Sequence, residues 1–225
     1  MMKTSEATAS PGHKESLRQE WSQNKVLRNT YALLSMTLFW SAGVSALTLT
    51  MGWPTPGFWV SLIGMLGLLF LVHATAESAL GLVSVFAFTG FAGYMLTPTL
   101  AHHLAFEGGG AIVGLALAGT ATTFLALSAY ALISRRHFES WGAPILIALV
   151  VILALAVLAY LLEVPALAIL VSIAVIPVSM ALILFETSAI IHGGETNYIR
   201  ATVGLFVALY NLFASLLNLL GLLNE

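Results

Sequence analysis

Long apolar stretches recur from Tyr31 to the end of the sequence, separated by short breaks rich in glycine and proline. About 20 consecutive apolar residues are enough for a helix to cross the ~30 Å hydrocarbon core of a bilayer. The pattern therefore predicts seven membrane-spanning helices, and breaks such as GWPTPG and EGGG have the composition of turns. The expected spans are 27–49, 57–74, 79–99, 111–133, 143–162, 165–191 and 198–222.

The composition excludes a soluble domain. Hydrophobic residues make up 59% of the 225 residues and charged residues only 8%, which is too little polar surface for a protein dissolved in water. We expect an all-α, polytopic membrane protein whose first partner is the lipid bilayer. The sequence has no basic surface typical of nucleic-acid binding, no cysteine for a thiolate metal site, and no motif that implies a cofactor.

The first 24 residues differ from the rest of the chain. They are rich in Ser, Thr, Glu, Lys and Gln, and Pro11–Gly12 interrupts them. A segment this polar cannot bury enough apolar surface to fold alone, so we predict a disordered tail over 1–24 and a transmembrane domain over 25–225. The tail is too long and too acidic for a cleaved signal peptide.

The basic residues predict the orientation of the bundle. With seven spans, all of them fall on the side of the N-terminus: Lys3, Lys14, Arg18, Lys25, Arg28, Arg135, Arg136 and Arg200. Because loops rich in lysine and arginine stay in the cytoplasm, the N-terminus is predicted to be cytoplasmic. The C-terminus is then on the opposite side of the membrane.

Small residues within the apolar stretches predict close helix contacts, since helices in lipid associate where their backbones can approach. The pairs concerned are Gly64 with Gly67, Gly90 with Gly93, and Gly114 with Ala118.

Ionisable groups gather in FETSAIIHGGETNYIR, residues 185–200. Gly193 and Gly194 are expected to end the sixth helix, and Thr196 or Asn197 to cap the seventh. Glu186 precedes the glycines by about two helical turns, roughly 10 Å, which places it at the edge of the hydrocarbon. An ionisable group there is a functional-site candidate. We expect Glu186 to face the bundle interior near the last helix and to sense protons.

Four other polar positions support this candidate site. His192 and Glu195 lie in the turn and indicate either a capped turn or a metal site, although the HExxH spacing is absent. Arg200 is expected at the membrane surface. Asn211, in the middle of the last helix, either joins two helices by a hydrogen bond or lines a pore.

The pair His102–His103 is expected in a solvated loop.

Three segments resemble one known family. LFETSAIIHGGETNYIRATVGLFVALYNLFASLLNLLG resembles the C-terminal signature of the Bax inhibitor-1/YccA family, also called the transmembrane Bax-inhibitor-motif family. NKVLRNTYALLSMTLFWSA and FAFTGFAGYMLTP resemble two other recurring segments. The resemblance covers the chain from about Asn24 to Gly221. It implies a seven-helix bundle in which the last helix is surrounded by the others, which agrees with the number of spans.

The resemblance implies two different activities. Some members of the family are proton-sensitive calcium leak channels, gated by a carboxylate pair on the last two helices. Glu186 matches the first position of the pair, but Ala208 occupies the second, so the pair is broken and calcium or proton gating rests on Glu186 alone.

The YccA-like branch implies the other activity. Its members are inner-membrane substrates and competitive inhibitors of the ATP-dependent protease FtsH, with FtsH and its membrane-bound regulators as partners. A polar tail offers the protease an end to grip, and a packed bundle resists extraction. Ser/His/acid arrangements and phosphate-binding loops are not discernible, so the sequence predicts no enzyme.

Overall fold

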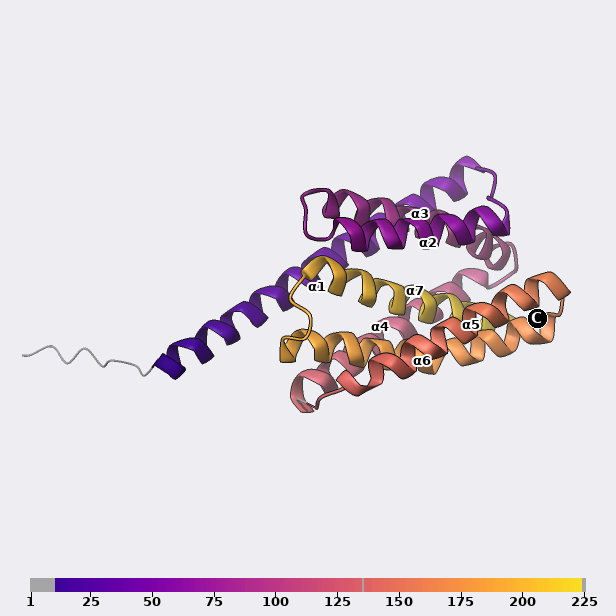
Figure 1. The fold of residues 1–225 in the computed structure, drawn as a ribbon. Coiled ribbons are helices and arrows are strands. Elements are labelled where there is room, and N and C mark those ends of the chain that lie inside the picture. The colour runs from indigo at the N-terminus through magenta and orange to yellow at the C-terminus, as the bar shows by residue number, and fades with distance from the viewer. Residues whose placement is uncertain (1–10, 135, 224–225) are drawn as a thin grey trace, which may run out of the picture.

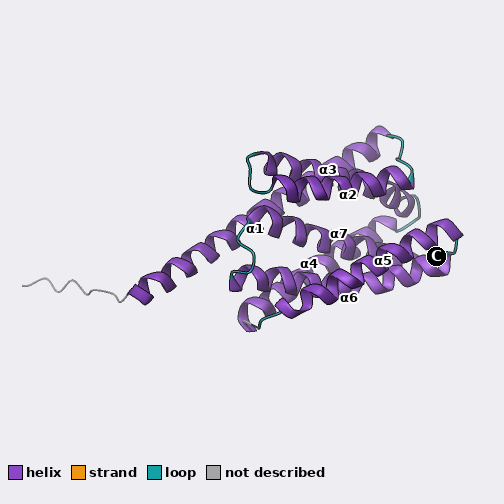
Figure 2. Ribbon diagram, in the orientation of Figure 1, coloured by secondary structure: helices purple, strands orange, loops and turns teal. Residues whose placement is uncertain are grey.

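A computed structural model describes residues 11–134 and 136–223, with side chains from Asn24 onward. Its regular structure is entirely helical over these residues (Figure 2). Seven helices are long and apolar enough to cross a membrane, as the sequence predicted. They are α1 (Pro11–Met51), α2 (Phe58–Thr75), α3 (Leu80–Leu104), α4 (Gly109–Ser134), α5 (Gly142–Leu162), α6 (Pro165–His192) and α7 (Tyr198–Leu222). A short 3₁₀ helix, η1 (Glu139–Trp141), precedes α5.

The N-terminal part of α1 differs from the sequence prediction. The helix begins at Pro11, so residues 11–24 are helical, whereas a disordered tail was expected there. Proline is accommodated in the first turn of a helix, and the Lys, Glu, Leu, Arg and Gln residues that follow are good helix formers. A helix that already exists in the membrane can propagate into them without a new nucleus. Residues 1–10 of the predicted tail lie outside the described residues.

The end of α3 also corrects a prediction. The sequence placed His102 and His103 in a solvated loop, but α3 continues through both and ends at Leu104. The His103 ring is buried, and its Nδ1 lies 2.8 Å from the backbone oxygen of Thr99. The ring lies against Gly221 of α7, so packing inside the bundle holds this last turn of α3.

The last helix occupies the centre of the bundle. α7 packs against α1, α2, α3, α4 and α6, and it runs between the α2–α3 pair and the α4–α6 layer (Figure 1). Its buried residues are mostly aliphatic or small and cover most of the helix surface. Only one side, formed by Gly204, Val207, Asn211, Ala214 and Asn218, is half-buried along its length. A helix that is apolar over most of its surface is expected to be buried, so the central position of α7 agrees with its sequence.

Close contact between α1 and α3 depends on small and hydroxylated residues. A Cβ built on Gly93 would overlap the backbone oxygen of Ser41, so only glycine allows this approach. The Thr48 and Thr97 hydroxyls are hydrogen-bonded at 2.6 Å between the two helices. Gly90 lies against the indole of Trp40 in the same interface, as predicted from small-residue spacing.

The outer helices α2 and α5 present apolar side chains to the surroundings of the bundle. Large exposed hydrophobics such as Ile63, Phe70 and Ile147 suit a lipid-facing surface. A Cβ on Gly67 or Gly114 would meet no atom within 4 Å, so the prediction that these two glycines mediate helix contacts is wrong. The reason is geometric: a small residue favours close packing only where another helix lies opposite.

Candidate functional site

The turn between α6 and α7 is built by its glycines. Gly193 has φ +78°, the left-handed conformation, and its N–H donates to the backbone oxygen of Ile190 at 3.3 Å. The Glu195 N–H then donates to the backbone oxygen of Ala189 at 3.1 Å. These two bonds satisfy carbonyls at the end of α6 and reverse the chain into α7, as the sequence predicted.

Asn197 caps α7 and ties the turn to a second part of the bundle. Its Oδ1 accepts hydrogen bonds from the N–H groups of Ile199 (2.9 Å) and Arg200 (3.4 Å). Its Nδ2 donates to the backbone oxygen of Ala76, just after α2, at 2.9 Å. Of the two caps the sequence allowed, Asn197 is therefore the one that the structure uses.

Glu186 lies against α7. Its side chain is half-buried, and its carboxylate occupies the space that a Cβ on Gly204 would need. Ala208 is fully buried one helical turn further along α7, on the same face as Gly204. The carboxylate thus faces a strip of α7 made of a glycine and an alanine, and Ala208 brings a methyl group to the position where the resemblance implied a second acid.

Glu195 and Arg200 make local contacts. The Glu195 Oε1 accepts a hydrogen bond from the Asn197 N–H at 2.7 Å. The Arg200 guanidinium pairs with Glu77 at 2.9 Å in the turn between α2 and α3. This ion pair is solvent-exposed, so it contributes little to stability.

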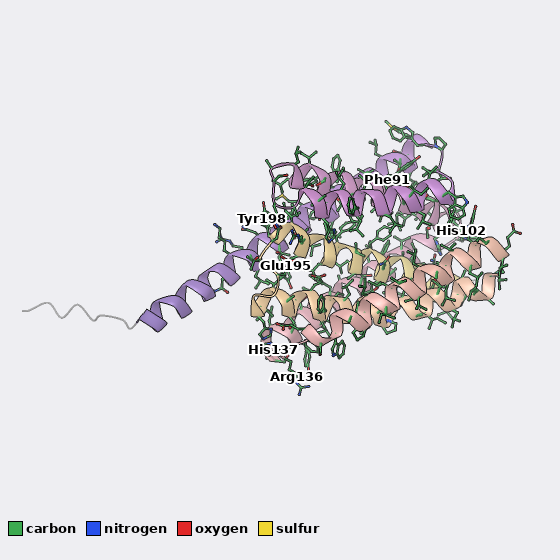
Figure 3. All side chains as sticks on the ribbon, viewed as in Figure 1. Phe91, His102, Arg136, His137, Glu195 and Tyr198 are labelled. Atoms are coloured by element: carbon green, nitrogen blue, oxygen red, sulfur yellow. The ribbon has the colours of Figure 1, made fainter. Side chains whose placement is uncertain are left out.

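His192 and Asn211 are not brought to Glu186. The His192 ring contacts the His137 ring of the α4–α5 loop in a tilted arrangement, with ring centroids 3.7 Å apart, and its Nδ1 lies 3.2 Å from the Ser188 hydroxyl. Asn211 is seven residues beyond Gly204, about 10 Å along α7. His137 and Glu195 lie at one end of the bundle and His102 at the other (Figure 3).

Ser188 is a structural residue that the sequence did not single out. It is fully buried, donates to the backbone oxygen of Arg136 at 3.0 Å and accepts from the N–H of Phe138 at 3.2 Å. One hydroxyl in α6 thus holds the loop that connects α4 to α5. Little in the sequence indicated this role, because a serine one turn before His192 can bond to its own helix or to many other neighbours.

The side chains of the turn engage separate neighbours, which favours the capped turn over the metal site. Within the part of the chain that the structure describes, no group of three or more His, Asp and Glu side chains is placed to hold a metal ion. His192 contacts the ring of His137, and Glu195 accepts a hydrogen bond from the backbone N–H of Asn197.

Comparison with known proteins identifies the family. A sequence model described as "Inhibitor of apoptosis-promoting Bax1" matches residues 23–225, which includes all seven spans. The chain belongs to the Bax inhibitor-1 family. The match covers the turn, its two flanking helices and the rest of the bundle, so the resemblance predicted from three segments is confirmed across the whole membrane domain.

Several relatives from bacteria match this Bax inhibitor-1 family member along most of their length. "Modulator of FtsH protease YccA" of Escherichia coli K12 is 48% identical over 200 residues, which cover 89% of this chain and 91% of the relative. An uncharacterized protein of Pseudomonas aeruginosa is 44% identical over 88% of this chain and 89% of its own length. An uncharacterized membrane protein of Vibrio cholerae is 37% identical over 93% of this chain and 95% of its own length.

Proposed function

We propose that this chain is an integral inner-membrane modulator of the ATP-dependent protease FtsH, which it engages as a slowly degraded substrate and thereby as a competitive inhibitor. The observation that carries the proposal is the 48% identity, over 89% of the chain, to a protein named as a modulator of FtsH protease. The modulator acts by occupying the protease, so no catalytic residue is required in this chain.

The position of the N-terminal part of α1 supports a role as a handle, meaning the segment that the protease grips first. It extends away from the other six helices, beyond the packed part of the bundle (Figure 1). Most of the stability of helices in proteins comes from packing against other elements. The segment 11–24 lies beyond the bundle (Figure 1) and lacks such packing, so it unfolds at little cost although it continues α1, and an ATP-driven pore needs such an end to grip.

The bundle behind the handle supports slow processing. α7 is surrounded on most sides, so it cannot leave the membrane domain before its neighbours separate. The turn that starts α7 is held by Gly193, by the Asn197 cap and by the Asn197 bond to the end of α2. Extraction must break this packing and these hydrogen bonds together, which delays release of the protease.

A pulse-chase experiment tests the proposal. The full chain, a variant lacking residues 2–22, and a variant in which a Gly/Ser segment of equal length replaces them are produced in cells with and without FtsH. Lys25 and Arg28 remain in all three, so the topology is preserved. We expect the full chain and the Gly/Ser variant to be degraded only where FtsH is present, and the deletion variant to be long-lived.

Competition is measured in the same cells through a second membrane substrate of FtsH. Overproduction of the full chain should lengthen the half-life of that substrate, since both chains compete for one protease. Equal half-lives of the full chain and the deletion variant, with and without FtsH, contradict the handle. An unchanged half-life of the second substrate contradicts the inhibition.

The position of Glu186 favours a second candidate function, a calcium leak sensitive to protons. Its carboxylate lies inside the bundle against α7, and the neighbouring Thr187 hydroxyl is buried with no hydrogen-bond partner among the described residues. A polar site at this depth in a membrane helix marks ion or proton pathways in other proteins. Purified protein in liposomes loaded with a calcium dye tests it: a flux abolished by Glu186→Gln supports the leak, and no flux excludes it.

A further inference from the structure

An apolar groove lies between α1 and α4, with α3 and α7 as its floor, and encloses about 450 Å³. Ligand pockets in proteins are typically about 300–1,000 Å³. The groove exists because the facing edges of α1 and α4 carry small residues, among them Ala42 and Ala46 on α1 and Ala121 on α4. Two helices with alanine at the facing positions leave a space that larger side chains would fill.

The groove spans one leaflet of the membrane. Along α1 its lining extends from Leu38 to Leu49, and along α4 from Val113 to Phe124, which is about 16 Å in each case. Half of the ~30 Å hydrocarbon core of a bilayer has nearly the same length. Leu49 and Val113 are close to the helix ends distant from the N-terminus, so the groove runs from that membrane surface to the middle of the bilayer.

The inner end of the groove is closed. Tyr31 of α1 contacts Phe124 of α4, with ring centroids 5.7 Å apart, and this contact joins the two helices on the side of the N-terminus. A transmembrane helix of a partner protein would need a groove that continues across the whole bilayer. A flexible chain that enters from one surface and ends at mid-membrane fits the closed end.

The lining of the groove is apolar. Fourteen of its eighteen residues are apolar, among them Leu100, Phe206 and Phe213. Of the four hydroxyl-bearing residues, Thr120 donates to the backbone oxygen of Ala116 at 2.8 Å, and Ser45 pairs with Thr97 at 3.5 Å. Water is held only where two to four polar groups can bind it, so a surface this apolar suits an apolar occupant.

The mouth of the groove is continuous with the lipid-facing surface. Leu117 and Leu104 line the groove and are about half exposed at the outside of the bundle. We propose that one acyl chain of a membrane phospholipid, from the leaflet distant from the N-terminus, occupies this groove and contacts the central helix α7. The groove is thus a lipid-binding site that depends on neither of the two candidate functions.

Photolabelling with a phospholipid tests this site. The protein is reconstituted in vesicles of phosphatidylethanolamine and phosphatidylglycerol that contain a phosphatidylethanolamine with a diazirine at the end of one acyl chain. After illumination, adducts are located by proteolysis and mass spectrometry. Bulk lipid reaches α2 and α5, whereas Phe206, Leu209 and Phe213 of α7 are buried and line the groove. We expect adducts at these three residues, and a diazirine near the headgroup should move the adducts toward Leu49 and Leu104.

Matched variants separate the groove from general lipid contact. Ala46→Phe with Ala121→Phe fills the groove, and we expect it to lose the adducts on α7 while it keeps those on α2 and α5. Ala32→Phe with Ala126→Phe changes exposed alanines of the same two helices outside the groove, and it should be labelled like the unmodified protein. Circular dichroism and gel filtration establish that both variants are folded.

The outcomes decide the proposal either way. Adducts on α7 that the groove-filling variant removes and the control variant retains support an acyl chain in the groove. Adducts confined to the outer helices of the unmodified protein overturn it, since a groove occupied by a second copy or by a partner's helix would exclude the lipid. Adducts on α7 that persist in the folded groove-filling variant also overturn it.

Discussion

At the scale of single residues, the turn before α7 was predictable where backbone conformation decides the residue type. Gly193 was expected to take the left-handed conformation and does so, because few other residues adopt it without strain. The contact between Glu186 and Gly204 was predictable only as a position near the last helix. Ser188 could not be predicted, since its partners Arg136 and Phe138 lie about 50 residues earlier in the sequence.

The two roles of Asn197 can be separated by substitution. Asn197→Ala removes both the cap of α7 and the hydrogen bond to Ala76, and we expect a loss of about 1–2 kcal/mol of unfolding free energy. Asn197→Asp keeps an oxygen that caps the helix but lacks the N–H donor for the Ala76 oxygen, so it should lose less unfolding free energy than Asn197→Ala. Unfolding by SDS in mixed micelles measures both. Equal losses would contradict a separate contribution from the bond to Ala76.

The contact between Glu186 and Gly204 predicts a coupled effect. Gly204→Ala places a methyl group where the carboxylate lies, and the displaced side chain should cost about 1 kcal/mol. In a Glu186→Ala background the same substitution should cost nothing, because the overlapping atoms are gone. Gly67→Ala, which meets no atom within 4 Å, is the control and should be neutral or slightly stabilising. Additive effects of the two changes in the same unfolding assay would place the carboxylate elsewhere.

At the scale of helices, the number and the order of the spans follow from apolar length, which a sequence records directly. Which helices pack against each other does not follow from apolar length. Gly90 and Gly93 lie against α1, whereas a Cβ on Gly67 or Gly114, which the spacing also singled out, would meet no atom within 4 Å. Which face of a helix meets another depends on the whole bundle, so small residues indicate where close approach is possible and not where it occurs.

The approach of α1 to α3 predicts a second effect on stability. In Gly93→Ala the new methyl group meets the backbone oxygen of Ser41, which cannot rotate away as a side chain can. The helices must separate, and the bond between Thr48 and Thr97 should lengthen or break. We expect a net loss of about 1–3 kcal/mol, larger than for Gly204→Ala. The SDS unfolding titration measures it; a Gly93→Ala protein as stable as Gly67→Ala would contradict the close approach.

At the scale of the whole molecule, the two described ends of the chain lie at opposite ends of the bundle (Figure 1). An odd number of membrane crossings leaves the two ends of a chain on opposite sides, and seven helices are long enough to cross. The basic residues in the described part, including Arg28, Arg136 and Arg200, then share the side on which α1 begins. The proposed handle and the turn that starts α7 are therefore on one side of the membrane, and the mouth of the proposed lipid groove is on the other.

This arrangement predicts a cytoplasmic N-terminus and a periplasmic C-terminus. Alkaline phosphatase is active only in the periplasm, and green fluorescent protein is fluorescent when it folds in the cytoplasm, so each is fused after Glu225 in separate strains. We expect an active phosphatase and no fluorescence, because loops rich in lysine and arginine remain in the cytoplasm. As a control, the same reporters placed in the α4–α5 loop, after Ser140, should give the opposite result. Cytoplasmic signals at both positions would mean that α7 does not cross the membrane, and the FtsH handle would then have to be tested on the orientation that the reporters establish.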